Sequence, residues 1–246
     1  MLILALDSTA VAASVAVTQD ERLLALYHLN NGNTHSETLL PMVESIMTRL
    51  GRDMEEVDLF AVSSGPGSFT GVRIGAATIK GLAFGRNKPC VGVSTLEALA
   101  GNLLGTARNG EIVCPVMNAR RGQVYNALFR VTPDGLERLT EDRAISVADL
   151  EAELVAMDAA ANFPVHLVGD GVAVTLAYAS DPSDPSLFRL APPLLREQNA
   201  YSVAMCALRA ARAGKTVSDT ELAPVYLRPC QAERERMERL QTEKQA

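Results

Sequence analysis

The chain has 246 residues, of which 48% are hydrophobic and 21% charged, and its formal net charge is −6. This length can bury one large core or two smaller ones, and the composition is that of a globular protein. The negative charge argues against an autonomous nucleic-acid-binding protein, because phosphate neutralisation supplies most nonspecific affinity. No apolar stretch is long enough to span a bilayer. The four cysteines form no C-x-x-C pair, so we expect free thiols and a cytoplasmic protein without membrane association.

Three short strand-like segments open the chain, at 2–6, 12–17 and 22–28, and polar pieces of turn length separate them. No basic region precedes the first segment, so we interpret the N-terminus as a strand and not as a signal peptide. An amphipathic helix is predicted over 34–50, with Gly51 at its end. Its apolar stripe is broader than contact with a single sheet requires.

A glycine-rich turn follows an apolar run at 58–63 and precedes a second helix, predicted over 70–86, that is apolar almost all round. Backbone N–H groups at such a helix start can hold an anion, which makes the turn a candidate for weak anion or nucleotide binding. The candidate residues are Gly65, Gly67, Ser68, Phe69, Thr70, Gly71 and Arg73. The alternative is a capped strand-to-helix connection that only positions a core helix.

The turn does not match the best-known phosphate-binding motifs. Gly65, Gly67 and Gly71 are spaced one residue more widely than the dinucleotide-binding pattern requires. The segment 214–216 mimics the end of a P-loop, but Arg209 stands where the first glycine belongs and a helical segment precedes it. We therefore exclude both motifs.

The rest of the chain continues the alternation of strands and helices. A strand at 90–93 and a helix from Ser94 complete the first half, and the pattern lapses at 102–111. In the second half, strands are predicted at 112–117, 124–130, 136–139, 165–168 and 224–227, and helices at 147–157 and 200–213. Beyond 231, alternating Glu and Arg indicates a solvated, fraying helix, with a binding arm as the alternative.

The two halves predict a duplicated ribonuclease-H-like α/β fold of the actin/Hsp70 (ASKHA) type, with two βββαβα-like halves. We assign 1–106 to an N-terminal domain, 107–230 to a second domain and 231–246 to a charged tail. The helix at 200–213 is a candidate to pack back on the first domain. In this superfamily an Asp after the first strand begins a phosphate loop, and the segment 7–9 (Asp-Ser-Thr) is a poor copy that lacks the glycine.

Several segments, spread over nearly the whole chain, resemble the TsaB (YeaZ) family. The most specific is Ser64–Gly75, which reads Ser-Gly-Pro-Gly-Ser-Phe-Thr-Gly-Val-Arg-Ile-Gly. The others are His35-Ser36-Glu37 with Leu40-Pro41, Gly92 to Leu96, Ala119 to Tyr125, and Pro224 to Arg228. The family commonly has Asp-Ala-Arg with a following Glu, whereas Asn118 and Gln123 stand here, so that two carboxylates become amides.

The resemblance implies a role in forming the threonylcarbamoyl modification on adenosine 37 of tRNAs that read codons starting with A. In that family the transferase is TsaD, TsaB is its noncatalytic partner of the same fold, and the ATPase TsaE joins them. It also implies a homodimer when alone, tRNA contact only through the complex, and ATP and metal on the partner subunits. No catalytic residue and no tightly bound cofactor are then expected here. Contact of Arg73, Arg120 or Arg121 with tRNA is left open.

The first long helix gives an independent argument about metal. The transferase relatives bind metal through an H-x-x-x-H pair, a spacing that aligns two imidazoles on one helical face. This chain has His35 but Leu39, so we expect no metal site of that kind. A lone histidine at a helix start is more often a capping or packing residue.

The wide stripe and the apolar second helix are interpreted together as a partner interface. Its predicted residues are Leu39, Leu40, Val43, Ile46, Met47, Val72, Ala76, Ile79 and Ala83. One rival is a small-molecule kinase or ATPase, with Asp7 as metal ligand and Ser68 or Thr70 on phosphate. Another is an actin-like domain that binds a different protein. A peptidase lacks support, because neither G-x-S-x-G nor H-E-x-x-H occurs.

Overall fold

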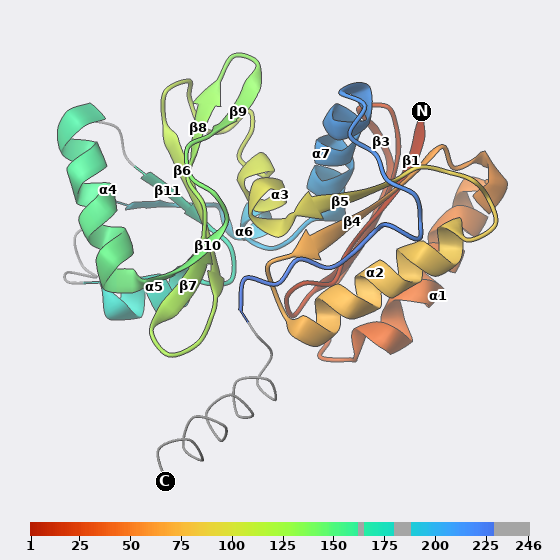
Figure 1. The fold of residues 1–246 in the computed structure, drawn as a ribbon, viewed down its shortest axis with the longest axis horizontal. Coiled ribbons are helices and arrows are strands. Elements are labelled where there is room, and N and C mark those ends of the chain that lie inside the picture. The colour runs from red at the N-terminus through yellow and green to blue at the C-terminus, as the bar shows by residue number, and fades with distance from the viewer. Residues whose placement is uncertain (162–164, 180–187, 229–246) are drawn as a thin grey trace, which may run out of the picture.

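Two β-sheets lie side by side, each with helices packed against it, as Figure 1 shows. The computed structural model describes residues 1–161, 165–179 and 188–228, so the predicted tail at 231–246 lies outside the described residues. The five-stranded path of each sheet has the same order, with the first strand of its half in the centre. The predicted duplicated α/β fold is therefore confirmed. No helix of the described ranges has the length and apolar character needed to cross a membrane.

The first sheet has the order β3-β2-β1-β4-β5, in which β1 runs parallel to β4 and antiparallel to β2. Its strands are β1 (Leu2–Asp7), β2 (Ala13–Gln19), β3 (Arg22–Leu29), β4 (Leu59–Gly65) and β5 (Cys90–Ser94). Its helices are α1 (His35–Leu50), η1 (Met54–Glu56), α2 (Phe69–Ala83) and α3 (Thr95–Gly101). Every residue of β1 and β4 is buried, as expected for central parallel strands covered on both faces.

The second sheet has the order β10-β7-β6-β11-β12, and a hairpin extends from β6. Its strands are β6 (Ile112–Asn118), β7 (Gln123–Asn126), β8 (Phe129–Thr132), β9 (Gly135–Arg138), β10 (Arg143–Ser146), β11 (Val165–Val168) and β12 (Phe188–Leu190). Its half also supplies the helices α4 (Val147–Ala161), α5 (Val172–Tyr178), α6 (Pro193–Arg196) and α7 (Ala200–Arg212). The last of these, α7, packs against the first sheet, where Val203 and Ala207 join Ile3 and Ala5 in one core cluster.

Two predicted strands differ from the structure for identifiable reasons. The strand predicted at 124–130 is divided into β7 and β8, and both pair with β6 on either side of Pro115. Proline has no N–H to donate to a ladder, which accounts for the break opposite it. The segment 224–227 forms no strand, because its described backbone pairing with β4 is limited to the hydrogen bond from Val225 N to Ser64 O at 2.7 Å.

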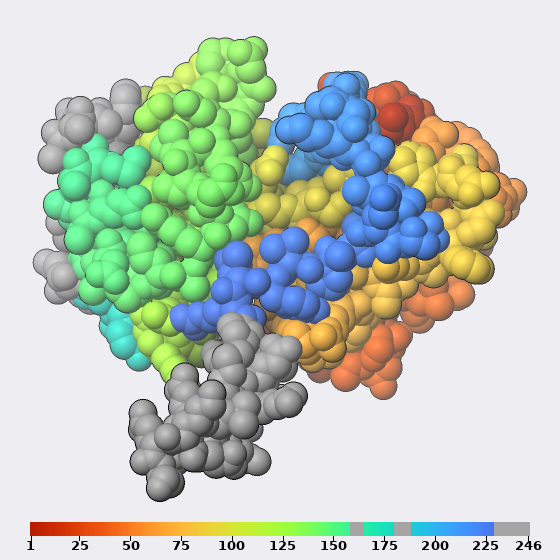
Figure 2. Space-filling model, in the orientation of Figure 1, coloured from red at the N-terminus to blue at the C-terminus, as the bar shows by residue number. Residues whose placement is uncertain are grey.

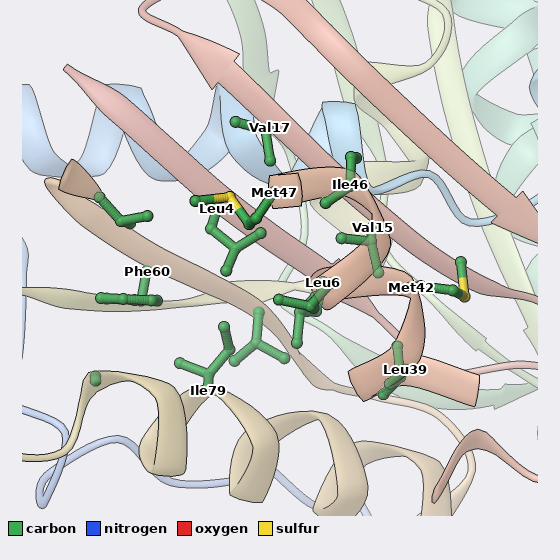
Figure 3. Packing of buried hydrophobic residues seen from close by; sticks show 14 of the residues in the cluster. Leu4, Leu6, Val15, Val17, Leu39, Met42, Ile46, Met47, Phe60 and Ile79 are labelled. Atoms are coloured by element: carbon green, nitrogen blue, oxygen red, sulfur yellow. The ribbon is translucent and has the colours of Figure 1, made fainter. Parts of the chain in front are cut away.

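The core beneath α1 explains the breadth of that helix's apolar stripe. Helix α1 packs on β2, on β3 and on α2 within the same chain. Figure 3 shows Met47 of α1 beside Leu4 of β1, and Leu39 and Ile46 of α1 belong to the same buried cluster as Leu4 and Leu6. Contact with a sheet and with a second helix requires a wider apolar arc than contact with a sheet alone.

After α7, residues 214–228 run back over the first half as an extended segment, here named the C-terminal strap. Val217 pairs with Cys90 in an isolated antiparallel bridge. Lys80 Nζ donates hydrogen bonds to the carbonyl oxygens of Thr220 at 3.1 Å and Leu222 at 3.0 Å. Figure 2 shows the end of the strap, in blue, crossing the surface between the two halves.

Candidate functional site at the cleft between the two halves

A cleft of about 680 Å³ opens where the two halves meet. Its walls come from the turn after β1, the glycine-rich turn before α2, the end of β6 with the turn that follows, the turn after β11, and the C-terminal strap. Because parallel central strands of each half end at this cleft, it corresponds to the place where open α/β sheets usually present functional groups.

The glycine-rich turn forms one wall of the cleft. The predicted turn residues that line it are Gly67, Ser68, Phe69 and Thr70. Gly65 and Gly71 are buried behind them, and Arg73 is exposed on α2, with its guanidinium 3.9 Å from the centre of the Phe69 ring. The structure therefore brings four of the seven predicted residues to the cleft and leaves three beside it.

Close packing against the turn after β1 accounts for the glycines. A Cβ atom on Gly67 would lie 2.5 Å from the carbonyl oxygen of Thr9, and one on Gly71 would clash with the carbonyl oxygen of Ser8. Ser68 N donates a hydrogen bond to Thr9 O at 2.7 Å. These contacts fix the start of α2 and support the positioning role of the turn.

A second glycine turn, which the sequence reasoning missed, occupies the matching place in the other half. Gly169 has a φ of +112°, and a Cβ atom there would clash with the carbonyl oxygen of Val116 on β6. Gly171 approaches the same strand, with Met117 N 2.8 Å from where its Cβ would be. The available signal was the Gly-Asp-Gly that directly follows β11, as Gly65 ends β4 and Gly67 comes two residues later.

Asp170, between those two glycines, contributes a carboxylate to the cleft wall. Its Oδ1 accepts a hydrogen bond from Gln198 Nε2 at 3.2 Å. Although Asp170 is an exposed residue, desolvation of its carboxyl group at the cleft raises the pKa above the ordinary value for aspartate.

Asp7, the candidate metal ligand of the kinase or ATPase alternative, is turned into the protein. One carboxylate oxygen accepts hydrogen bonds from Thr9 N at 2.9 Å and Thr9 Oγ1 at 2.8 Å, and the other accepts one from Ser63 Oγ. Complete burial raises the pKa of this carboxyl group, and the hydrogen bonds only partly oppose that effect. Both oxygens are thus engaged inside the chain, next to the cleft but not in its wall.

His35 and Leu39 are the two positions of this chain that have the spacing of an H-x-x-x-H pair. His35 Nε2 donates a hydrogen bond to the carbonyl oxygen of Ala10 at 2.7 Å, which ties the start of α1 to the turn after β1. Leu39 is 1% exposed and belongs to the core. In the part of the chain that the structure describes, no group of three or more His, Cys, Asp and Glu side chains has a metal-binding arrangement.

The predicted interface residues lie almost entirely inside the chain's own core, which corrects their assignment. Eight of the nine are at most 5% exposed. They are Leu39, Val43, Ile46, Met47, Val72, Ala76, Ile79 and Ala83. Leu40 is the exception, at 46%. The sheet and the neighbouring helix already cover these eight side chains, so they are unavailable to a partner, while docking of a partner on α1 and α2 stays a prediction.

Comparison with known proteins identifies close relatives. The family model described as TsaD, tRNA N6-adenosine threonylcarbamoyltransferase, matches residues 30–235. The tRNA threonylcarbamoyladenosine biosynthesis protein TsaB of Escherichia coli (strain K12) is 32% identical over 234 residues, which cover 93% of this chain and 95% of that protein. TsaB of Bacillus subtilis (strain 168) is 34% identical over 149 residues, 61% of this chain and 64% of that protein.

Among solved structures, a Pseudomonas aeruginosa protein described as similar to the peptidase YeaZ superposes with a TM-score of 0.78. It is 29% identical, and the alignment covers 92% of this chain and 99% of that one. The resemblance seen in the sequence motifs is therefore confirmed over the length of the fold. The chain belongs to the TsaB (YeaZ) family, within the wider family that the TsaD model describes.

Proposed function

We propose that this chain is a noncatalytic partner of a TsaD-like transferase in the formation of threonylcarbamoyl-adenosine at position 37 of tRNAs that read codons starting with A. The observation that carries the proposal is the nearly full-length match to a protein named tRNA threonylcarbamoyladenosine biosynthesis protein TsaB. A TsaE-like ATPase joins the pair in the cytoplasm, and tRNA is bound by the complex. ATP and metal are held by the partner subunits.

The noncatalytic role is supported by the two positions where chemistry was most expected. A kinase or ATPase would need the Asp7 carboxylate to reach a metal in the cleft, whereas both its oxygens accept hydrogen bonds within the chain. A transferase-type metal pair would need a second imidazole at position 39, where Leu39 packs in the core. Steady ATP turnover by the purified chain would favour the kinase or ATPase alternative.

The surface proposed for the transferase is the outer side of α1 and α2, which contact each other and lie together in Figure 1. Leu40 on α1 is 46% exposed, and Phe84, directly after α2, is 75% exposed. On α2, Ala77 and Gly81 are exposed small residues one helical turn apart, which allow another helix to approach closely. The same surface would form a homodimer when the chain is alone.

Charge introduced on this surface tests the docking proposal. Leu40→Glu and Ala77→Arg should each weaken co-purification with the transferase by about 30-fold or more, because an unpaired charge buried at an interface costs about 2–5 kcal/mol. Val155→Glu on α4 is the matched control, since Val155 is an exposed apolar helix residue in the other half. Val43→Glu is unsuitable, because the Val43 side chain is completely buried and its replacement would unfold the core.

The readouts are size-exclusion chromatography of each variant, alone and with the transferase, and tRNA modification in a reconstituted assay. Leu40→Glu alone should elute as a monomer, and modification should require the wild-type chain. Normal complex formation by both variants would contradict the proposed surface. Full modification in the absence of the chain would contradict the proposed function.

A further inference from the structure

Three arginines from two separate segments gather at the rim of the cleft. Arg120 lines the cleft from the turn between β6 and β7, and Arg121 follows it in the same turn. Arg228, at the end of the C-terminal strap, donates a hydrogen bond from Nη1 to the carbonyl oxygen of Ala119 at 3.1 Å. That bond places the Arg228 side chain beside the turn that holds the other two.

The positive charge of this rim is not balanced by neighbouring acids. Within residues 1–161, 165–179 and 188–228, neither Arg120, Arg121 nor Arg228 forms an ion pair, whereas Arg130 and Arg138 of the same half pair with carboxylates. Asp170 is the only acid among the described residues that line the cleft. On a chain whose net charge is −6, such a local cluster indicates a site for an anion.

The backbone conformation of this turn does not depend on the side chains of Arg120 and Arg121. Arg120 and Arg121 both have positive φ, 64° and 56°, a region that glycine adopts freely and that costs other residues free energy. The turn is closed by backbone hydrogen bonds between Ala119 and Gln123 and between Gln123 and Arg120. Glycine would therefore make this turn at least as well, so the turn itself does not require arginine at either position.

Aromatic surfaces lie along the same cleft. The rings of Phe69 and Tyr226 have centroids 4.9 Å apart, and the Arg73 guanidinium covers the first while its Nε donates to the Tyr226 hydroxyl at 2.9 Å. Tyr226 is 41% exposed, and Tyr125 also lines the cleft. Basic groups alternating with exposed aromatic rings are the chemistry that binds single-stranded nucleic acid, through phosphates and through stacked bases.

We propose that Arg120, Arg121 and Arg228 hold phosphates of an unpaired tRNA segment at the rim of the cleft, with Tyr226 as a surface for a base. This inference rests on the proposed function, because an acidic chain needs the complex to supply the remaining RNA affinity. A free nucleotide shares the same phosphate and base chemistry, so the experiment must separate the two sources.

The test uses the complex reconstituted with the transferase and an unmodified tRNA transcript, with affinity measured by fluorescence anisotropy over a range of salt concentrations. The double variant Arg120→Gly/Arg121→Gly removes both guanidinium groups and relieves the strained turn, so unfolding cannot explain a loss. It should weaken tRNA binding by about tenfold and reduce the slope of log K against log salt by about 1.4, for two lost phosphate contacts. Arg120→Lys/Arg121→Lys should retain most of the affinity.

Arg22→Gly, which removes an exposed arginine from β3, is the control and should leave both quantities unchanged. Unchanged affinity and slope for the glycine variant in an assembled complex would overturn the inference alone. Calorimetry of the glycine variant with ATP and with AMP tests whether the site instead holds a free nucleotide. Loss of nucleotide binding with unaltered tRNA affinity would also overturn the inference. Failure of the wild-type chain to assemble with the transferase would count against the proposed function and this inference together.

Discussion

At the scale of single residues, Asp7 bears most directly on the proposal that this chain is a noncatalytic partner, because it is the candidate metal ligand of the kinase or ATPase alternative. Burial raises the pKa of its carboxyl group above the ordinary aspartate value of 3.8, so the folded chain holds this proton more tightly than the unfolded chain. The contribution of Asp7 to the free energy of unfolding is therefore largest below pH 3.8 and falls as pH rises through the folded-state pKa.

Asp7→Asn should remove that pH-dependent contribution and cost little else. The amide oxygen can keep the two hydrogen bonds from Thr9, and the amide nitrogen can donate to Ser63 Oγ, which then reverses its role. We expect the free energy of unfolding at neutral pH to change by about 1 kcal/mol or less. Relative to the wild type, the variant should be more stable at pH 8 than at pH 4 in urea titrations. Loss of tRNA modification in the reconstituted complex would instead indicate a chemical role for the carboxylate.

Gly71 and Gly81 form a matched pair on one helix. A Cβ atom on Gly71 would clash with the carbonyl oxygen of Ser8, whereas one on Gly81 has no neighbour within 4 Å. Gly71→Ala should lower the free energy of unfolding by about 2–3 kcal/mol through overpacking, and Gly81→Ala should raise it by about 0.5–1 kcal/mol through helix propensity. Chemical denaturation checks both values. Equal effects would show that the tight approach at Gly71 does not matter.

At the scale of elements, backbone and side-chain hydrogen bonds hold the C-terminal strap to the first half, and Lys80 donates two of them. Lys80→Ala removes both donors and should lower the free energy of unfolding by about 1–3 kcal/mol. Hydrogen exchange at the Val225 amide, bonded to Ser64 O, should accelerate more than exchange in β1. Lys88→Ala provides the control, since Lys88 is also half-buried and lies just before β5, the edge strand that the strap contacts at Cys90. Uniform acceleration through the first sheet would argue against a local role.

The elements that follow a strong local pattern were predictable from the sequence, and the exceptions have physical causes. Helices α1 and α2 and strand β4 follow from apolar periodicity and from the glycines beside them. Strand β10, with every residue half-buried, gives little signal, and helix α5 has only seven residues. The division of β7 from β8 depends on Pro115 in a partner strand, which no local window contains.

The candidate site was predictable only in part. The glycine-rich turn stands out locally, but the cleft also needs Asn118, Asp170 and Tyr226, which are far apart in sequence. The predicted interface residues show a second limit of prediction from the sequence. The width of an apolar stripe reports that a helix is covered, and it does not tell whether the cover is the chain's own sheet and helix or another subunit.

At the scale of the whole molecule, the two halves share a packing arrangement of glycine turns as well as a fold. In each half, the turn after the second parallel strand brings glycines against the end of the central strand, at Ser8 in one and at Val116 in the other. This packing sets the distance between the strand ends and so shapes the cleft. Under the proposed function, this cleft serves as a surface for contact and not as a catalytic site.

The placement of α3 and α7 has a consequence for how the chain is made. Leu96 and Leu99 of α3 are buried with β6 residues of the second half, while α7 is buried on the first sheet. The first sheet, which is synthesised first, therefore keeps the apolar surface beneath α7 exposed until α7, whose last residue is Arg212, has left the ribosome. Each half therefore contributes a helix to its neighbour, and during synthesis the first sheet is completed only when α7 of the second half becomes available.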